Sequence, residues 1–261
     1  MKIVELRNVY FQYDKNVILE NINLELEEKT FLAIIGPNGS GKTTLLNIIS
    51  GLKKVSKGEV FVFEKKLCRK NIVEVRKEIG YVAQNYIIDK KLPFLVKDII
   101  SLGRYGKVGF FKNLSYEDKS IIEETISFLK IEDLKEKPIG HISSGECQKI
   151  HIARVLVQQP KILLLDEPTS SLDPKSQHEL LKLVEDIYLK KNITTIFVTH
   201  ILNHIPSCCN KIILLKNGKI ISSGKPDEVL KKDILSNLYT CDVEIEIINN
   251  KRHFHIGPLH P

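Results

Sequence analysis

The chain has 261 residues, of which 43% are hydrophobic and 27% are charged. This length and composition are sufficient to bury a substantial core in one large or two small domains. Lysine and arginine together number 39 against 32 aspartates and glutamates, which gives a net charge of +7. Because this small excess is spread along the chain and forms no dense basic block, we expect no nucleic-acid partner.

The sequence also argues against a membrane span, a signal peptide and a disulfide framework. No segment approaches the roughly 18 uninterrupted apolar residues that a membrane-spanning helix needs. Residues 1–7 are charged and alternating where a signal peptide would be apolar, so we expect the chain to stay in the cytoplasm. The cysteines are odd in number and include no C-x-x-C pair, which predicts reduced thiols instead of disulfides or a zinc site.

Two alternating apolar segments open the chain and predict strands over residues 3–11 and 17–26. Tyr13 lies between them, shortly before a glycine-rich loop. An aromatic side chain in this place can stack on an adenine base, or it can be an ordinary residue at the end of a strand. The position alone does not decide between these two interpretations.

The glycine-rich loop at residues 36–43 has the complete G-x-x-x-x-G-K-[ST] spacing of a phosphate-binding loop. An apolar strand is predicted before it, at 30–35, and a helix after it, at 44–50. The glycines let backbone N–H groups form an anion nest at a helix N-terminus, the lysine supplies charge for the β- and γ-phosphates, and the threonine hydroxyl suits Mg²⁺. The residues expected to bind nucleotide here are Gly36, Pro37, Asn38, Gly39, Ser40, Gly41, Lys42, Thr43 and Thr44.

The rest of the chain reads as an α/β pattern that a helical stretch interrupts. Helical periodicity runs from about residue 95 to 157, and three glycines predict a loop within it, from 103 to 115. Outside this stretch we expect strands at 59–63, 79–84, 161–167, 194–200, 211–215 and 219–222, and a helix at 177–189. Polar residues that end the parallel strands should meet at one edge of the sheet, where such sheets bind ligands.

One buried strand ends in adjacent carboxylates, Asp166 and Glu167. This arrangement suits a division of labour in which Asp166 supports Mg²⁺ and Glu167 orients or deprotonates an attacking water. Two solvated loop acids would be the alternative, but the P-T-S-S-L-D run that follows fits that interpretation poorly. Residues 162–173 closely resemble the extended Walker B motif and D-loop of ATP-binding cassette (ABC) ATPases, with Ser171, Leu172 and Asp173 as the D-loop residues at the dimer interface.

The same family carries an L-S-G-G-Q signature shortly before Walker B, and I-S-S-G-E at 142–146 occupies that place. Ser144 replaces the first signature glycine and Glu146 replaces the glutamine, whereas Ser143 and Gly145 are kept. By this resemblance Ser143, Ser144, Gly145 and Glu146 bind ATP. The resemblance further implies roles for four other side chains. Gln84 is the Q-loop glutamine that reaches Mg²⁺ and water, His200 is the switch histidine at the γ-phosphate, and Tyr13 is the aromatic that stacks on adenine. Thr43 is a ligand that holds Mg²⁺ together with Gln84 and Asp166.

The resemblance covers about residues 4–224 and implies the ABC ATPase fold, in which an α/β P-loop NTPase core sheet carries an antiparallel β subdomain and an inserted α-helical subdomain. We expect residues 1–240 to form one such domain, with the helical insert at about 90–158, and 241–261 to add a β-hairpin-like extension. The family hydrolyses ATP with Mg²⁺ as a homodimer that sandwiches two ATP molecules. Each ATP lies between the phosphate loop of one subunit and the signature of the other.

With one cassette and no membrane segment, the chain is similar to the separate ATPase subunit of bacterial or archaeal importers. Such a subunit works at the cytoplasmic face of the membrane with permease subunits and, indirectly, with an extracytoplasmic solute-binding protein. Residues 92–106 and 116–118 are similar to subfamilies that import zinc or manganese, or iron–siderophore, haem or cobalamin. A soluble ABC ATPase acting on nucleic acid, the ribosome or iron–sulfur assembly is the alternative, as is a non-catalytic subunit, which would lack Glu167 or His200.

The end of the chain alternates as two strands around an Asn-Asn turn at 249–250. His253 and His255 would share one face of the returning strand, with His260 nearby. These histidines could form a metal-sensing tail or belong to a plain hairpin. We favour the hairpin, because no carboxylate or cysteine accompanies the histidines at ligand spacing.

Overall fold

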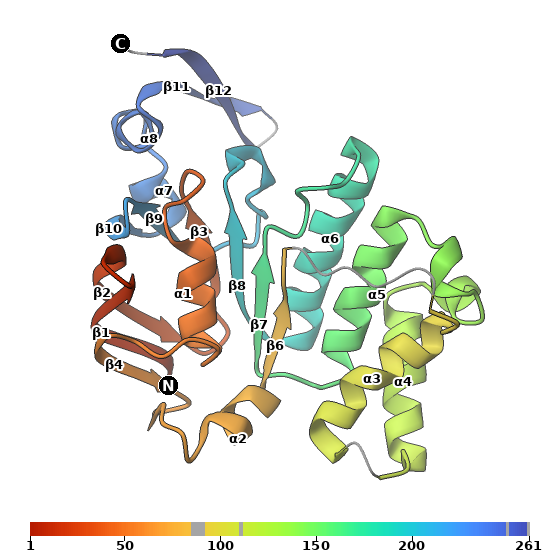
Figure 1. Ribbon diagram of the computed structural model, residues 1–261. Coiled ribbons are helices and arrows are strands. Elements are labelled where there is room, and N and C mark those ends of the chain that lie inside the picture. The colour runs from red at the N-terminus through yellow and green to blue at the C-terminus, as the bar shows by residue number, and fades with distance from the viewer. Residues whose placement is uncertain (85–91, 110–111, 249–250, 260–261) are drawn as a thin grey trace.

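A six-stranded sheet lies at the centre of the molecule, in a computed structural model that describes residues 1–84, 92–109, 112–248 and 251–259 (Figure 1). Its strand order is β10-β9-β3-β8-β7-β6, and all neighbours run parallel except β9 and β10. Strands β3, β7 and β8 are buried along their whole length, because other layers cover both faces of the sheet. The six strands are β3 (Phe31–Ile35), β6 (Ile79–Val82), β7 (Ile162–Asp166), β8 (Thr194–Thr199), β9 (Lys211–Lys216) and β10 (Lys219–Gly224).

Helix α1 (Lys42–Ile49) covers one face of this sheet, with a second, antiparallel sheet beyond it (Figure 1). Because side chains alternate along a strand, Leu32 and Ile34 of β3 point to this side, where they join a buried cluster with Leu45 and Leu46 of α1. The second sheet has four strands in the order β2-β1-β4-β5. They are β1 (Lys2–Tyr13), β2 (Asn16–Glu27), β4 (Lys57–Val62) and β5 (Lys65–Lys66), and the short helix α2 (Ile72–Lys77) leads from them to β6.

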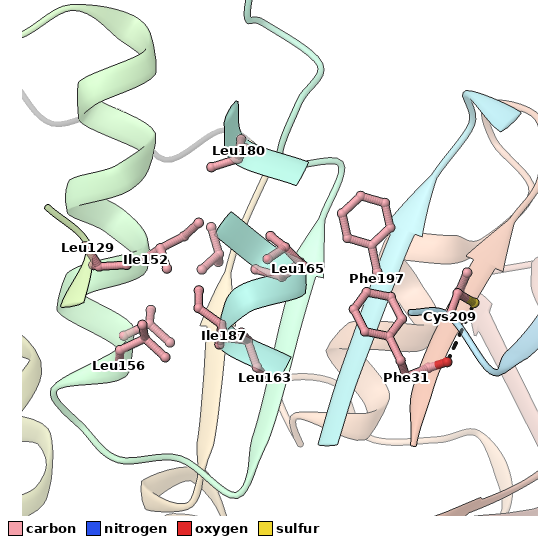
Figure 2. Close-up of a cluster of buried hydrophobic side chains, with 14 of the residues drawn as sticks. Phe31, Leu129, Ile152, Leu156, Leu163, Leu165, Leu180, Ile187, Phe197 and Cys209 are labelled. Carbon is pink, nitrogen blue, oxygen red and sulfur yellow. Dashed lines mark hydrogen bonds between the residues drawn. The ribbon is translucent and has the colours of Figure 1, made fainter. Parts of the chain in front are cut away.

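A layer of helices covers the opposite face. Phe31, Leu163 and Leu165 of the sheet pack there with Ile152 and Ile187 of the helices (Figure 2). Each such side chain contributes about 1.5–3 kcal/mol on full burial, so the helical layer is firmly attached to the strands that carry the site. The helices are α3 (Val96–Val108), α4 (Tyr116–Phe128), α5 (Ser144–Leu156) and α6 (Pro174–Lys191), and two short 3-10 helices, η1 (Glu132–Leu134) and η2 (Ile139–His141), join α4 to α5.

The loop expected at residues 103–115 was wrong over 103–108, because α3 continues through Gly103 and Gly106 to Val108, whereas residues 109 and 112–115 lie outside any helix or strand. A Cβ atom at Gly103 would lie only 1.7 Å from the carbonyl oxygen of Arg154 in α5. The glycine at this position therefore permits close helix packing instead of ending a helix. The expected start of the helical insert near residue 90 lies outside the described residues.

The chain ends in a group of small elements beyond the sheet (Figure 1). Strands β11 and β12 pair antiparallel, with Val243 opposite Ile256. Among the described residues, no helix is both long enough and apolar enough to cross a membrane. The elements after β10 are α7 (Pro226–Val229), α8 (Lys232–Tyr239), β11 (Cys241–Ile248) and β12 (Lys251–Leu259), and the short 3-10 helix η3 (Leu202–His204) lies earlier, between β8 and β9.

Candidate nucleotide-binding site

The phosphate loop connects the carboxyl end of β3 to the first residue of α1, Lys42. Gly41 has a φ of 103°, a left-handed conformation that favours glycine. The Ser40 side chain is buried, and its Oγ has no hydrogen-bond partner among the described residues. Buried polar atoms are normally paired, so an unsatisfied hydroxyl within an anion nest fits a site for a phosphate group.

Lys42 is the charged centre of this loop. Its side chain is only 5% exposed, and its Nζ donates to the carbonyl oxygens of Gly36 at 2.9 Å and Pro37 at 3.0 Å. Burial lowers the pKa of Lys42, and the nearby carboxylate of Glu167 opposes that shift. The ammonium is thus held within the loop by neutral carbonyls, which a phosphate oxygen can replace.

Asp166, the last residue of β7, accepts hydrogen bonds at both carboxylate oxygens. The Thr43 hydroxyl donates to Oδ1 and the Tyr81 hydroxyl donates to Oδ2, each at 3.2 Å. Burial raises the pKa of Asp166, while these two donors oppose the rise. The separation of the Thr43 and Asp166 oxygens is near the roughly 3 Å edge of a Mg²⁺ octahedron, so this pair of oxygens fits a magnesium ion.

Glu167 gathers three motif residues that are distant in sequence. The Gln84 amide Nε2 donates to its carboxylate at 2.9 Å, His200 Nδ1 lies 3.0 Å from the same Oε2, and Lys42 Nζ lies 3.5 Å from Oε1. Glu167 has a φ of 47°, which is unusual for a residue other than glycine and is held by its N–H donating to Val198. The buried carboxylate therefore lies where the ends of β6, β7 and β8 meet the phosphate loop.

Lys42, Glu167 and His200 line one cavity of about 490 Å³, whereas Ser40 and Asp166 are not in its lining. Tyr13 lies at its wall and is 45% exposed, with its ring edge-on to Phe11 at 4.9 Å and the ammonium of Lys53 at 4.5 Å from its centroid. The lining residues are Tyr13, Ile18, Asn38, Gly39, Gly41, Lys42, Thr43, Thr44, Gln84, Glu167, Ser170 and His200.

Ile18 and Ser170 in this lining were not expected from the sequence, and neither was the Tyr81 hydroxyl that donates to Asp166. A periodic pattern does not separate Tyr81 from a core tyrosine of its strand, so no sequence signal could have identified it.

The signature does not join this cavity: none of Ser143, Ser144, Gly145 and Glu146 is among the described residues that line it. Ser143 caps α5, and the Glu146 carboxylate accepts from its N–H at 2.8 Å and from its hydroxyl at 2.6 Å. These bonds lower the pKa of Glu146. Ser143 and Glu146 therefore form a capping box at the start of α5.

The D-loop lies beside the signature, at the start of α6. Asp173 caps α6 by accepting from the N–H groups of Lys175 at 3.0 Å and Ser176 at 3.1 Å. Lys149 of α5 and Glu179 of α6 pair at 2.9 Å, which fixes the two helix starts side by side. Signature and D-loop therefore form one surface, separate from the cavity at the phosphate loop.

The neighbours of the C-terminal histidines differ from the expectation in one respect. Glu244 lies opposite His255 and Glu246 opposite His253 across the β11–β12 pair, so carboxylates do accompany these histidines. His255 Nε2 is 3.4 Å from the Glu246 carboxylate. Within the described residues no group of three or more His, Cys, Asp or Glu side chains is arranged to hold a metal ion, and His260 lies outside them.

Comparison with known proteins agrees with this geometry. The family model for the ABC transporter matches residues 19–170. The petrobactin import ATP-binding protein YclP of Bacillus subtilis (strain 168) is 33% identical over 250 residues, covering 96% of this chain and 98% of YclP. The zinc uptake system ATP-binding protein ZurA of Listeria innocua serovar 6a (strain ATCC BAA-680 / CLIP 11262) is 34% identical over 253 residues, covering 96% of this chain and 94% of ZurA.

The fold is also that of a solved transporter. A structure described as a metal-chelate type ABC transporter in an inward-facing conformation superposes with a TM-score of 0.84 at 27% identity, covering 100% of this chain and 98% of that chain. The α/β core with an antiparallel β subdomain and added helices, expected from the sequence, is thereby confirmed. The chain belongs to the ABC transporter family and is one of its ATP-hydrolysing cassettes.

Proposed function

We propose that the chain is the ATPase subunit of an importer at the cytoplasmic face of a membrane. It energises uptake of a metal ion or metal chelate (zinc or manganese, or iron–siderophore, haem or cobalamin) through separate permease subunits and, indirectly, an extracytoplasmic solute-binding protein. The observation that carries the proposal is the convergence of Lys42, Gln84 and His200 on the buried Glu167 carboxylate. The likeness to petrobactin, zinc and metal-chelate transporters supports the class of cargo.

Each group at the site has a step in hydrolysis. The loop N–H groups, Ser40 and Lys42 bind the phosphates, and Tyr13 stacks on the adenine. Glu167 orients a water and accepts its proton as the water attacks the γ-phosphate, while His200 donates to the γ-phosphate oxygen. Thr43, Asp166 and Gln84 supply the oxygen ligands for Mg²⁺. The ion neutralises phosphate charge when it is bound.

A second copy completes the site in this proposal. Ser143 to Glu146 do not reach the cavity of their own chain, yet they lie with the D-loop residues Ser171, Leu172 and Asp173 on one surface. A head-to-tail dimer places the signature of each subunit on the γ-phosphate held by the other. ATP then links two subunits, and loss of the γ-phosphate releases them.

A second cavity, of about 430 Å³, is a suitable place for a permease segment. It lies between the end of α1, α2, α3 and α5, and it exposes the apolar side chains of Leu52 and Leu102. Tyr81 lines it and also donates to Asp166, so a segment seated there touches a residue of the nucleotide site. This link offers a path by which hydrolysis is coupled to transport.

Affinity purification of the tagged chain from detergent-solubilised host membranes tests the proposal. We expect a multi-spanning subunit to co-purify, together with a metal- or chelate-binding protein. Recovery of ribosomes, nucleic acid or a soluble assembly scaffold instead would overturn the importer assignment and leave the ATPase unchanged.

A further inference from the structure

Helix α8 and the β11–β12 hairpin, together called the C-terminal extension below, contact the segment that carries His200. Tyr239, the last residue of α8, donates its hydroxyl to the carbonyl oxygen of His200 at 3.1 Å. Three residues after His200, the Asn203 side chain exchanges two hydrogen bonds with the backbone of Phe254 in β12. Asn203 Nδ2 donates to the Phe254 carbonyl at 3.2 Å, and the Phe254 N–H donates to Asn203 Oδ1 at 2.9 Å. The segment from 200 to 203 is therefore held at both ends by the extension.

The extension is itself fixed to the core. Leu235 and Leu238 of α8 and Phe254 of β12 are all buried in the same apolar cluster as the helical face of the sheet. Within the extension, the N–H of Val243 donates to Ser236 Oγ at 3.0 Å, which joins β11 to α8. Because both elements are anchored, they can act as a rigid support for the segment that they touch.

The same segment reaches the catalytic edge of the sheet on its inner side. His200 Nδ1 lies 3.0 Å from the Glu167 carboxylate, and His204 Nδ1 lies 2.9 Å from the hydroxyl of Thr169, two residues beyond Glu167. A shift of the segment would thus move His200 relative to Glu167. The hydrogen bonds of Tyr239 and Asn203 oppose such a shift from the outer side.

The hydrogen bonds of Tyr239 and Asn203 lie on the outer side of the segment. A cavity of about 500 Å³ adjoins them, with Asn203, Arg252, His253 and Phe254 in its lining. On that side the hairpin and the segment are joined by the Asn203–Phe254 hydrogen bonds and by the packing of Leu202 and Phe254 in one buried apolar cluster. Burial raises the pKa of the Tyr239 phenol, so the phenol stays protonated at neutral pH and can donate.

We propose that Tyr239 and the Asn203–Phe254 link are positioning contacts through which the C-terminal extension sets the place of His200 for ATP hydrolysis. This inference rests on the proposed role of His200 at the γ-phosphate. Tyr239, Asn203 and Phe254 do not themselves line the cavity at the phosphate loop, so we expect their loss to act on turnover and to leave ATP binding unchanged.

The test compares Tyr239→Phe with Tyr188→Phe in the full chain. Tyr188 serves as the control, because it is also half-buried and its hydroxyl also donates to a backbone carbonyl, that of Lys29 at 2.8 Å, at the opposite edge of the sheet. Its hydroxyl also accepts from Asn210 Nδ2 at 3.0 Å, so Tyr188→Phe loses one hydrogen bond more. We expect Tyr239→Phe to lower kcat about three- to tenfold, with a Kd for ATP equal to that of Tyr188→Phe and a melting temperature no lower than that of Tyr188→Phe. Asn203→Ala removes both hydrogen bonds between the segment and Phe254 of the hairpin. It should likewise lower kcat and leave the Kd for ATP unchanged.

A double substitution shows whether Tyr239 acts through His200. In a His200→Ala background, Tyr239→Phe should cause no further loss of kcat. Full turnover by both Tyr239→Phe and Asn203→Ala, or an undiminished effect of Tyr239→Phe without His200, would overturn the inference while leaving the proposed function intact. Full turnover by His200→Ala itself would overturn the proposed role of His200, so the two failures are distinguishable.

Discussion

The ammonium of Lys42 lies 3.5 Å from the carboxylate of Glu167, and the two side chains are only 5% and 8% exposed. Two residues separated by more than a hundred positions thus neutralise each other in a buried place, where either charge alone would be strongly disfavoured. A nucleotide phosphate that binds Lys42 leaves the Glu167 carboxylate available to a water. In the proposed function, the pair would therefore couple phosphate binding to the availability of Glu167 as the base.

Lys42→Ala should weaken ATP binding roughly ten- to a hundredfold, because a charge-assisted hydrogen bond to phosphate is lost. It should also reduce the free energy of unfolding, since the Glu167 carboxylate is left buried without its cation. Isothermal titration with ATP and urea unfolding measure the two effects. The double variant Lys42→Ala/Glu167→Gln separates them, because it should recover stability without recovering affinity. An ATP affinity of Lys42→Ala equal to that of the parent chain would show that the loop does not bind phosphate as described.

Ser143→Ala should reduce ATP-dependent dimerisation, because the signature hydroxyl faces the nucleotide of the other subunit in the proposed dimer. Ser143 also caps α5, so the variant needs a control that loses a cap alone. Ser115→Ala provides it, since Ser115 caps α4 in the same way, with Asp118 in the role of Glu146. Both variants should lose about 1 kcal/mol of stability. Light scattering with ATP in a Glu167→Gln background measures the fraction of dimer. Equal dimer fractions for Ser143→Ala and Ser115→Ala would contradict the proposed dimer.

Gly103→Ala and Gly106→Ala should have opposite effects on stability although both glycines lie in α3. A methyl group at Gly103 meets the Arg154 carbonyl of α5, whereas one at Gly106 has no described atom within 4 Å. We expect Gly103→Ala to destabilise the protein by about 1–3 kcal/mol through overpacking. Gly106→Ala should stabilise it by about 0.5–1 kcal/mol, because alanine favours the helix. Urea unfolding at one temperature compares them, and equal effects would exclude close packing of α3 on α5 as the cause.

The sequence predicted the parts of the site whose chemistry depends on neighbouring residues. The phosphate loop needs its glycines and lysine at fixed spacing between a strand and a helix, and Asp166 with Glu167 needs only a buried strand before it. Both motifs can be recognised in a few consecutive residues. Both lie at the carboxyl ends of parallel strands, as expected for such a sheet.

The remaining features depend on contacts between distant segments. Gly103 looks like a helix breaker until α5 is placed against it, and Tyr81 looks like a core residue until Asp166 is placed opposite its hydroxyl. The carboxylates across from His253 and His255 are found only when the register of β11 and β12 is known. Single-sequence periodicity describes one element at a time, so it does not contain these relationships.

Glu167→Gln tests the central claim most directly, because it keeps the shape of the side chain and an oxygen that accepts hydrogen bonds while removing the base. ATP affinity and steady-state hydrolysis should be measured on the same preparation. The account predicts a kcat at least about a hundredfold lower, as expected for loss of a general base, with an ATP Kd no weaker than that of the parent chain. A variant that hydrolysed ATP at the parent rate would contradict the assignment of Glu167 as the group that activates water.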